Sequence, residues 1–235
     1  MNASVDTLPR CEVVEAPART TAFAQVESGR GSDDRNPDDF AREQIRALVR
    51  LVFFARGRAV QRVVFSAAEP HLSVASICDQ VARSLALETL ASVALVECNE
   101  QQAAAGEPRV LSGENNTIKF YSPQMAINLW RVSRTALGKC NGETGTGRHW
   151  ISCLAQLRNE FEYLVIHGPA AAGSSEAALL GHLTDGIVLV LAAHSTRKAS
   201  ARKIKETMEA AQSRILGTVL SDRTFPIPER IYRRL

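Results

Sequence analysis

Two patterns of hydrophobic and polar residues alternate along the chain. In the first pattern a short run is apolar at nearly every position, as in Gly186–Leu191, which is typical of a strand buried on both faces. In the second pattern apolar residues recur at helical spacing, which predicts a helix with one buried face. A clear example of this spacing is the set Val74, Ile77, Val81 and Leu85. The alternation indicates strands that are joined by helices.

The predicted elements run from about residue 38 to residue 220. Strands are expected at residues 59–65, 92–96, 117–121, 127–132, 163–166, 186–191 and 215–220. Helices are expected at residues 38–54, 74–87, 149–161, 174–183 and 196–214, and the polar stretch 99–116 is expected to be rich in turns. Buried strands with intervening helices predict an α/β fold of three layers, with a mostly parallel central sheet.

Composition divides the chain into three parts. Residues 1–37 are rich in Ala, Pro, Ser, Gly and charged residues, so we expect a disordered N-terminal tail that buries too little apolar surface to offset its ordering entropy. Residues 38–222 contain the predicted elements and form the folded domain. Residues 223–235 combine prolines with arginines. This extension either docks on a partner or on anionic lipid headgroups, or is simply solvated.

Charge and cysteine content exclude several classes of protein. The 235 residues carry a net charge of only +3, so nothing requires a nucleic-acid partner. The five cysteines contain no C-x-x-C pair, which fits a reduced cytoplasmic compartment better than a disulfide framework. Residues 1–10 lack the apolar core of a signal peptide, and the longest apolar run, 187–193, is too short to span a bilayer. We therefore expect a cytoplasmic protein that is recruited if it acts at a membrane.

The loop after the first predicted strand is the first candidate site, because ligands of parallel sheets bind at the carboxyl ends of the strands. A phosphate-binding loop needs glycines, whose N–H groups surround the phosphates, and a lysine. The loop here, Ser66–Ala75, contains neither. In addition, Glu69 brings a negative charge and Pro70 lacks an N–H donor. The sequence therefore argues against a phosphate-wrapping loop at this place.

Two further strand ends carry polar residues. Glu97 follows the second predicted strand, where its carboxylate is either a ligand for Mg²⁺ or water, or an ordinary loop residue. His167 stands where a phosphate-transferring site would place a carboxylate that steers Mg²⁺. A lone histidine of this kind is more typical of a structural residue than of a ligand or base. No metal site is predicted.

Several segments share the order and spacing of one known family. The segment Phe161–Pro169 (FEYLVIHGP) matches a family pattern FDYVIIDTPP, and the likeness continues through residues 175–190 and 196–220. Residues 93–99 (VALVECN) match a segment vLLIDaD, and residues 63–68 match the lead-in to a nucleotide-binding loop. In these segments the chain resembles the bacterial tyrosine kinases of capsular and exopolysaccharide assembly, which are related to the septum-site and partition ATPases. The resemblance covers about residues 40–225 and implies a P-loop-NTPase-like fold.

The resemblance also implies where a nucleotide would bind, and the chain departs from the family there. Glu69–Ser73 stands in place of the PGEGKT loop, Glu97-Cys98-Asn99 replaces the acidic pair, and His167 replaces the Walker B aspartate. The degenerate positions are Ser66, Ala67, Ala68, Glu69, Ser73, Glu97, Asn99 and His167. The oligomer motif Glu-x-x-Arg-x-x-Arg is approximated by Glu43, Arg46 and Arg50, with Arg50 one residue late. Only Tyr232 remains of a C-terminal tyrosine cluster.

A second glycine-rich stretch, Gly142–His149, resembles the GETGTGKS loop of enhancer-dependent transcription activators. Arg148 stands in place of the lysine, and His149 in place of the Mg²⁺-binding Ser or Thr. The nearest predicted strand ends at Val132, although a nucleotide-binding loop follows its strand directly. The stretch is therefore either a connecting loop or, because a helix follows it, a weak anion site.

These departures favour a protein that keeps the fold without catalysis. We expect a pseudo-kinase or pseudo-ATPase without a cofactor, acting as a regulatory or scaffolding partner in exopolysaccharide or capsule biosynthesis. The resemblance implies a membrane-anchored polysaccharide chain-length or export protein as the partner, recruitment to the inner face of the membrane, and a homo- or hetero-oligomer.

Two alternatives differ in what they require of the chain. The first is an active tyrosine kinase or ATPase using ATP and Mg²⁺, with Arg148, Arg197 or a partner's residue in place of the lysine. The second is a partition-type DNA or membrane-surface factor. The modest charge and the absence of a basic helix with interleaved aromatic residues disfavour it.

Overall fold

Apolar runs and amphipathic segments form the strands and helices that the sequence pattern predicts. The computed structural model describes residues 37–55, 59–98, 109–112, 118–121, 128–133, 147–193 and 195–221, all within a unit that spans residues 32–235. The predictions for the tail before residue 37, for Asn99, for Gly142–Thr146 and for the extension 223–235 lie outside the described residues.

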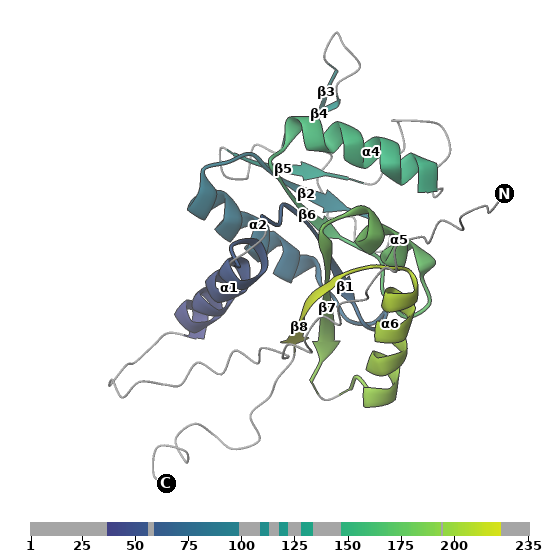
Figure 1. Ribbon diagram of the computed structural model, residues 1–235. Coiled ribbons are helices and arrows are strands. Elements are labelled where there is room, and N and C mark those ends of the chain that lie inside the picture. Colours follow the sequence, from purple (N-terminus) through teal and green to yellow (C-terminus); the bar gives the residue numbers. More distant parts are fainter. Residues whose placement is uncertain are drawn as a thin grey trace, which may run out of the picture. The chain divides into compact units, whose positions relative to one another are not determined.

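The elements follow one another in the predicted order (Figure 1). The helices are α1 (Pro37–Phe53), α2 (Ala75–Thr89), α4 (Gly147–Glu160), α5 (Ser175–Leu183) and α6 (Lys198–Ala210). The strands are β1 (Arg62–Ala67), β2 (Val93–Glu97), β3 (Arg109–Ser112), β4 (Ile118–Tyr121), β5 (Leu129–Val132), β6 (Tyr163–His167), β7 (Gly186–Ala192) and β8 (Ile215–Ser221).

Six strands form one parallel sheet in the order β5-β2-β6-β1-β7-β8, which confirms the predicted α/β class. The strands β3 and β4 form a separate antiparallel pair. The sequence did not predict β3, because this short strand lies in a polar stretch without an apolar run. The helix that was expected to extend to residue 214 ends at Ala210, and Gln212 then adopts a left-handed conformation.

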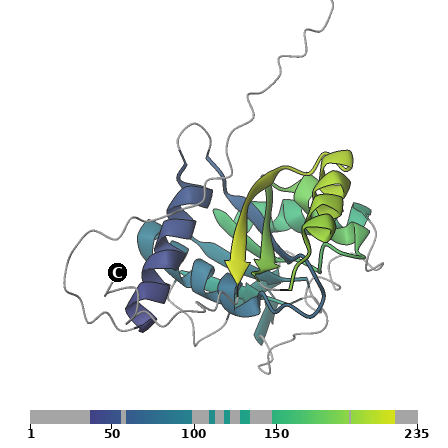
Figure 2. The same ribbon diagram turned by 90° about the horizontal axis from the view of Figure 1, so that it is seen from below.

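Alternate residues of each strand point to opposite faces of the sheet, and each face has its own helical layer. Val63 and Phe65 of β1 belong to the hydrophobic core under α1 and α2, whereas Val64 packs into the core under α4, α5 and α6. Figure 2 shows the two helical layers on opposite sides of the sheet. The three-layer arrangement explains why the strands are apolar at consecutive positions.

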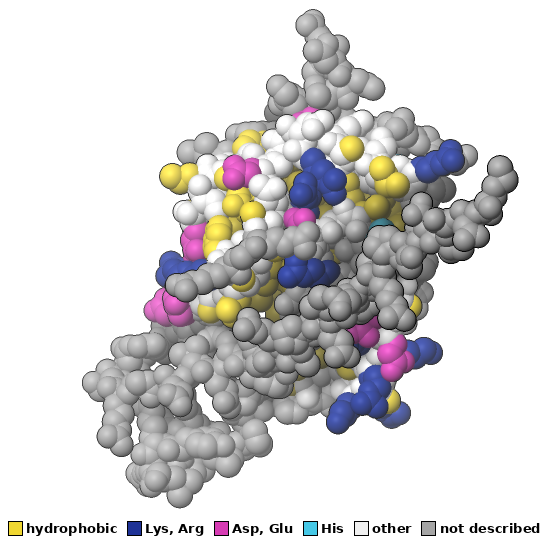
Figure 3. Space-filling view, viewed as in Figure 1, with side chains coloured by type: hydrophobic (Ala, Val, Ile, Leu, Met, Phe, Trp, Pro, Cys, Tyr) yellow, Lys and Arg dark blue, Asp and Glu magenta, His cyan; other side chains and the backbone are white. Residues whose placement is uncertain are grey.

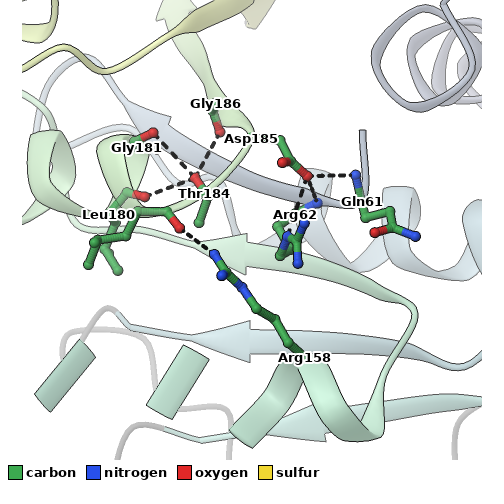
Figure 4. A network of polar contacts seen from close by, with 9 residues as sticks. Gln61, Arg62, Arg158, Leu180, Gly181, Thr184, Asp185 and Gly186 are labelled. Carbon is green, nitrogen blue, oxygen red and sulfur yellow. Dashed lines mark hydrogen bonds and ion pairs between the residues drawn. The ribbon is translucent and has the colours of Figure 1, made fainter. Parts of the chain in front are cut away.

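Asp185, in the turn between α5 and β7, connects the first residues of two strands at the amino-terminal edge of the sheet (Figure 4). Its Oδ2 atom accepts hydrogen bonds from the backbone N–H groups of Gln61 and Arg62, each at 2.8 Å. The backbone N–H of Asp185 donates in return to the carbonyl of Arg62. Burial alone would raise the pKa of Asp185, but the two N–H groups and the Arg62 guanidinium hold this pKa below its ordinary value of 3.8. The start of β1 is therefore tied to the start of β7.

The end of α5 lies in the same network (Figure 4). The Thr184 hydroxyl donates to the carbonyl of Leu180 at 2.8 Å, and the Arg158 guanidinium donates to the carbonyl of Leu183 at 2.7 Å. These contacts satisfy carbonyl groups that have no partner inside the last helical turn.

Candidate functional site

The loops at the carboxyl edge of the sheet meet as the parallel topology requires. The N–H of Ala68, after β1, donates to the carbonyl of Val190 in β7 at 2.8 Å. The N–H of Cys98, after β2, donates to the carbonyl of His167 at 2.9 Å. The structure thus brings together the residues that the sequence singled out at the ends of β1, β2 and β6, except Asn99, which lies outside the described residues.

The loop between β1 and α2, residues 68–74, has a conformation without a phosphate nest. Such a nest forms when consecutive N–H groups converge in alternating right- and left-handed conformations. All seven residues of this loop are described, and none of them has a positive φ angle. The N–H of Ala68 is already used by the sheet, and that of Leu72 donates to the carbonyl of Glu69 at 3.2 Å in a turn. The side chains of Glu69 and His71 approach each other to 3.3 Å.

The buried Ser66 at the end of β1 is bonded within the chain. Its hydroxyl donates to the carbonyl of Pro169 in the loop after β6 at 2.6 Å. Two further hydrogen bonds join these segments, because the N–H groups of Ala171 and Ala172 donate to the carbonyls of Ala67, which ends β1, and of Ala68. Gly168 permits this approach, since a Cβ atom there would lie 2.8 Å from Val64 Cγ1. The end of β1 is thus joined by hydrogen bonds to the loop after β6.

Glu97 is the last residue of β2, and its carboxylate belongs to a series of ion pairs in which acidic and basic side chains alternate. Its Oε1 atom lies 2.7 Å from Nη1 of Arg131 on β5, and Nη2 of Arg131 lies 3.0 Å from Asp79 on α2. Asp79 also lies 2.7 Å from Arg83. Burial raises the pKa of Glu97 above its ordinary value of 4.5, and Arg131 offsets only part of this effect. The carboxylate therefore has a cationic partner inside the protein.

Sequence reasoning did not single out Arg131 or Asp79. The usable signal was a single arginine within the otherwise apolar strand Leu129–Val132, because a charge that is partly buried in a strand favours an oppositely charged partner. The sequence does not reveal which acid is that partner. Only the pairing of β5 beside β2 places Arg131 next to Glu97.

His167 ends β6 directly opposite Glu97 in the sheet register. The residue is 4% exposed, and its burial lowers the pKa of the imidazole below the ordinary value of 6.5. The side chain is therefore neutral at pH 7. A neutral imidazole does not provide the negative charge by which a carboxylate steers Mg²⁺.

The part of the chain that the structure describes contains no group of three or more His, Cys, Asp or Glu residues arranged to hold a metal ion. The largest cluster of charged side chains at this edge is the Arg83–Asp79–Arg131–Glu97 chain, in which acids and bases alternate. Its charges are satisfied among themselves.

The oligomer-motif candidates all lie on α1. In α1 the carboxylate of Glu43 lies 3.7 Å from Arg46, and Arg50 lies 3.7 Å from Glu88 of α2. These contacts leave the predicted oligomer motif untested.

At the end of the second glycine-rich stretch, α4 begins at Gly147, with Arg148 exposed and His149 buried. The strand before it, β5, ends at Val132 as predicted, so no described strand leads directly into this stretch. Whether it binds an anion stays a prediction.

None of the helices in the described ranges has the length and apolar character needed to cross a bilayer.

Sequence comparison relates the chain to bacterial tyrosine kinases. It is 32% identical over 65 residues to the tyrosine-protein kinase CpsD of Streptococcus agalactiae serotype III, and this match spans 28% of the chain and 28% of that kinase. It is 29% identical over 73 residues to the tyrosine-protein kinase YwqD of Bacillus subtilis, or 31% of each chain. No family model matches the chain.

Structural comparison extends the likeness to most of the chain. The chimerical protein CapA2B2 superposes with a TM-score of 0.61 at 19% identity, over 76% of this chain and 83% of that one. The kinase domain of the Escherichia coli tyrosine kinase ETK superposes with a TM-score of 0.59 at 15% identity, over 85% and 86% of the two chains. At these identities the superpositions establish the shared fold. The chain is thus similar in sequence to bacterial tyrosine-protein kinases over about three tenths of its own length and of theirs, and it shares the α/β fold of their kinase domains.

Proposed function

We propose that this chain is a non-catalytic member of the bacterial tyrosine-protein kinase family, a pseudo-kinase that regulates or scaffolds exopolysaccharide or capsule biosynthesis. The observation that carries the proposal is the loop between β1 and α2. It has no lysine, no glycine and no left-handed residue, and the N–H of Ala68 is committed to β7.

The loop geometry disfavours the binding of a triphosphate. A nucleotide-binding loop stabilises several negative charges with converging N–H groups and one lysine. Here the first N–H after the strand pairs with Val190, Pro70 has none, and the acidic Glu69 lies in the turn. The residues at this position do not fit the phosphates of ATP.

The residues at the positions that would hold Mg²⁺ also support a non-catalytic protein. Glu97 is the only acid left of the family's carboxylates at this edge, and its partner is the Arg131 guanidinium at 2.7 Å. A metal ion at Glu97 would have to displace this arginine or lie beside its positive charge. The neutral His167 offers no replacement. Loss of a phosphate-clamping cation and of a metal carboxylate costs several kcal/mol of transition-state stabilisation, on the order of 3 kcal/mol for a single removed electrostatic group.

The proposed role in capsule or exopolysaccharide synthesis rests on the resemblance to the bacterial tyrosine kinases. The chain's recognised relatives are named tyrosine-protein kinases, and the family resemblance connects such kinases with capsule and exopolysaccharide assembly. We propose that the partner is a membrane-anchored chain-length or export protein and that the chain works at the inner face of the membrane. A pulldown with the cytoplasmic segments of such a protein tests this part. Retention by an unrelated membrane protein at the same level would contradict it.

Isothermal titration with ATP and Mg²⁺ tests the loss of nucleotide binding. We expect no measurable heat for the full chain, and micromolar binding by the Streptococcus agalactiae kinase CpsD under the same conditions. The same samples are then assayed for transfer of radiolabelled phosphate to tyrosine.

The competing possibility is an active kinase or ATPase with an unusual site. Micromolar binding of MgATP that is lost in Glu97→Gln or Ser73→Ala, and kept in the exposed control Glu206→Gln, would establish that possibility and overturn the proposal. Phosphotyrosine formed by the purified chain would do the same.

A further inference from the structure

The cations of α6 are distributed differently from those of α1. Each arginine of α1 has an acidic neighbour at 3.7 Å, on its own helix or on α2. On α6 and its N-cap residue, five cations are exposed, namely Arg197, Lys198, Arg202, Lys203 and Lys205. Among the described residues only Lys205 has an acidic partner, Glu209 at 3.5 Å, and that pair is exposed and weak. Four positive charges therefore lack an acidic neighbour in this part of the chain.

The order of charges along α6 also opposes the helix dipole. The positive end of a helix dipole lies at the N-terminus, where acidic side chains are favourable and basic ones are not. The first turn of α6 contains no acidic residue, and its cations begin at Arg197, while Glu206 and Glu209 follow in the second half. This order does not serve the stability of the helix. It does concentrate positive potential at one end of one helix.

Three of the five exposed cations lie on one side of α6. Lys198, Arg202 and Lys205 are spaced by four and three residues and so lie on one side of the helix. A neighbouring side of the helix, about 100° around its axis, is anchored in the core by Ile204 and Met208. Figure 3 shows Lys and Arg side chains at the lower right, where Figure 1 places α6, with Asp or Glu side chains next to them.

An exposed leucine lies at the same edge of the same face. Leu220 of β8 is 49% exposed, and its register partner Leu191 packs with the core beneath α4, α5 and α6. Since β8 and β7 are parallel, Leu220 lies near the carboxyl end of the sheet, where α6 begins. Cations and an exposed apolar side chain at the same end of the domain suit the interface of an anionic bilayer.

We propose that the first two turns of α6 and the end of β8 form a surface that docks on anionic lipid headgroups. The whole-chain charge of +3 conceals this local concentration. Nucleic acid fits the surface less well, because no aromatic residue lies among the cations for stacking. The inference does not depend on whether the carboxyl edge binds a nucleotide.

Co-sedimentation of the full chain with phosphatidylcholine vesicles, with and without phosphatidylglycerol, tests the proposal. We expect binding only with phosphatidylglycerol, weakened by salt. Each cation near such a surface contributes about 1 kcal/mol, or roughly fivefold in partitioning, so Lys198→Gln/Arg202→Gln/Lys205→Gln should weaken binding by about 100-fold. Glu206→Gln/Glu209→Gln should strengthen it, because these acids lie on the same helix.

A control variant also removes three positive charges, but from residues outside α6. Arg42→Gln/Arg158→Gln/Arg214→Gln changes three exposed arginines outside the α6 surface and should leave vesicle binding within about threefold of the unmodified chain. Equal losses in the two triple variants would mean that only total charge matters and would overturn the proposal. So would binding to phosphatidylcholine alone, or tighter salt-sensitive binding to duplex DNA than to the anionic vesicles.

Discussion

Replacement of Asp185 tests how the amino-terminal edge of the sheet is held together. The substitution Asp185→Ala removes the one oxygen that accepts from both Gln61 N–H and Arg62 N–H. It also removes the carboxylate that lies 3.5 Å from Nε of Arg62, a buried atom for which the described residues provide no hydrogen-bond partner. The substitution Asp185→Asn keeps an acceptor oxygen but removes the charge. The pair of variants therefore separates the geometric part of the contact from the electrostatic part.

The magnitude follows from the two hydrogen bonds. A hydrogen bond to a charged group contributes about 1.5–3 kcal/mol, and an unsatisfied buried donor costs about 1–3 kcal/mol. Because the Asp185 side chain is 16% exposed, water can reach part of the vacated space. We expect a loss of about 2–4 kcal/mol in the free energy of unfolding for Asp185→Ala and about 1–2 kcal/mol for Asp185→Asn. Domains of this kind have only about 5–15 kcal/mol in total.

Urea unfolding monitored by the fluorescence of Trp130 and Trp150 measures these losses. The control Asp39→Asn removes a carboxylate that is 62% exposed and 3.7 Å from Arg42, and it should cost less than about 0.5 kcal/mol. The pH dependence has a definite sign. The folded-state pKa of Asp185 is depressed, so its stabilisation is present above the ordinary value of 3.8 and is lost as pH falls below it.

The advantage of the unmodified chain over Asp185→Asn should therefore shrink below about pH 4. Equal unfolding midpoints for the unmodified chain and Asp185→Ala at pH 7 would refute the reasoning. A difference between the unmodified chain and Asp185→Asn that grew with acidity would refute the electrostatic part.

Two further variants test the carboxyl edge and the packing of α5. Arg131→Gln removes the cation that lowers the pKa of the half-buried Glu97, so it should cost about 3–5 kcal/mol at pH 8 and less at pH 5, where Glu97 can take up a proton. Urea midpoints at the two pH values measure this cost, and an equal cost at both would contradict it. Gly181→Ala places a methyl group against the buried hydroxyl of Ser213 and should cost about 1–3 kcal/mol in the same assay. The double variant with Ser213→Gly should recover part of that loss, and no recovery would contradict this reading of the contact.

The strands of the central sheet were predictable because of their burial. A strand covered on both faces, such as β7, is apolar at consecutive positions, and this pattern is visible without any tertiary information. The short strand β3 was missed, since it lies in a polar stretch and pairs only with β4. The end of α6 was placed too late, because the helical pattern of apolar residues continues beyond the turn at Gln212.

The candidate site was only half predictable. Topology alone places Ser66, Glu97 and His167 at one edge, because parallel strands end on the same side. The sequence does not tell whether these groups are available to a ligand. That depends on Pro169, which accepts from Ser66, and on Arg131, which pairs with Glu97. Both partners come from segments that are distant along the chain.

The sequence by itself determined the class of fold, the order of its elements and the absence of lysine and glycine from the loop after β1. These are properties of composition and local periodicity, which each segment carries alone. Only the tertiary structure decided which charges are neutralised. The sequence shows basic residues in both α1 and α6, but it does not show that Arg50 pairs with Glu88 across two helices. Charges meet through packing, because Coulomb attraction depends on distance in space and not on separation in sequence.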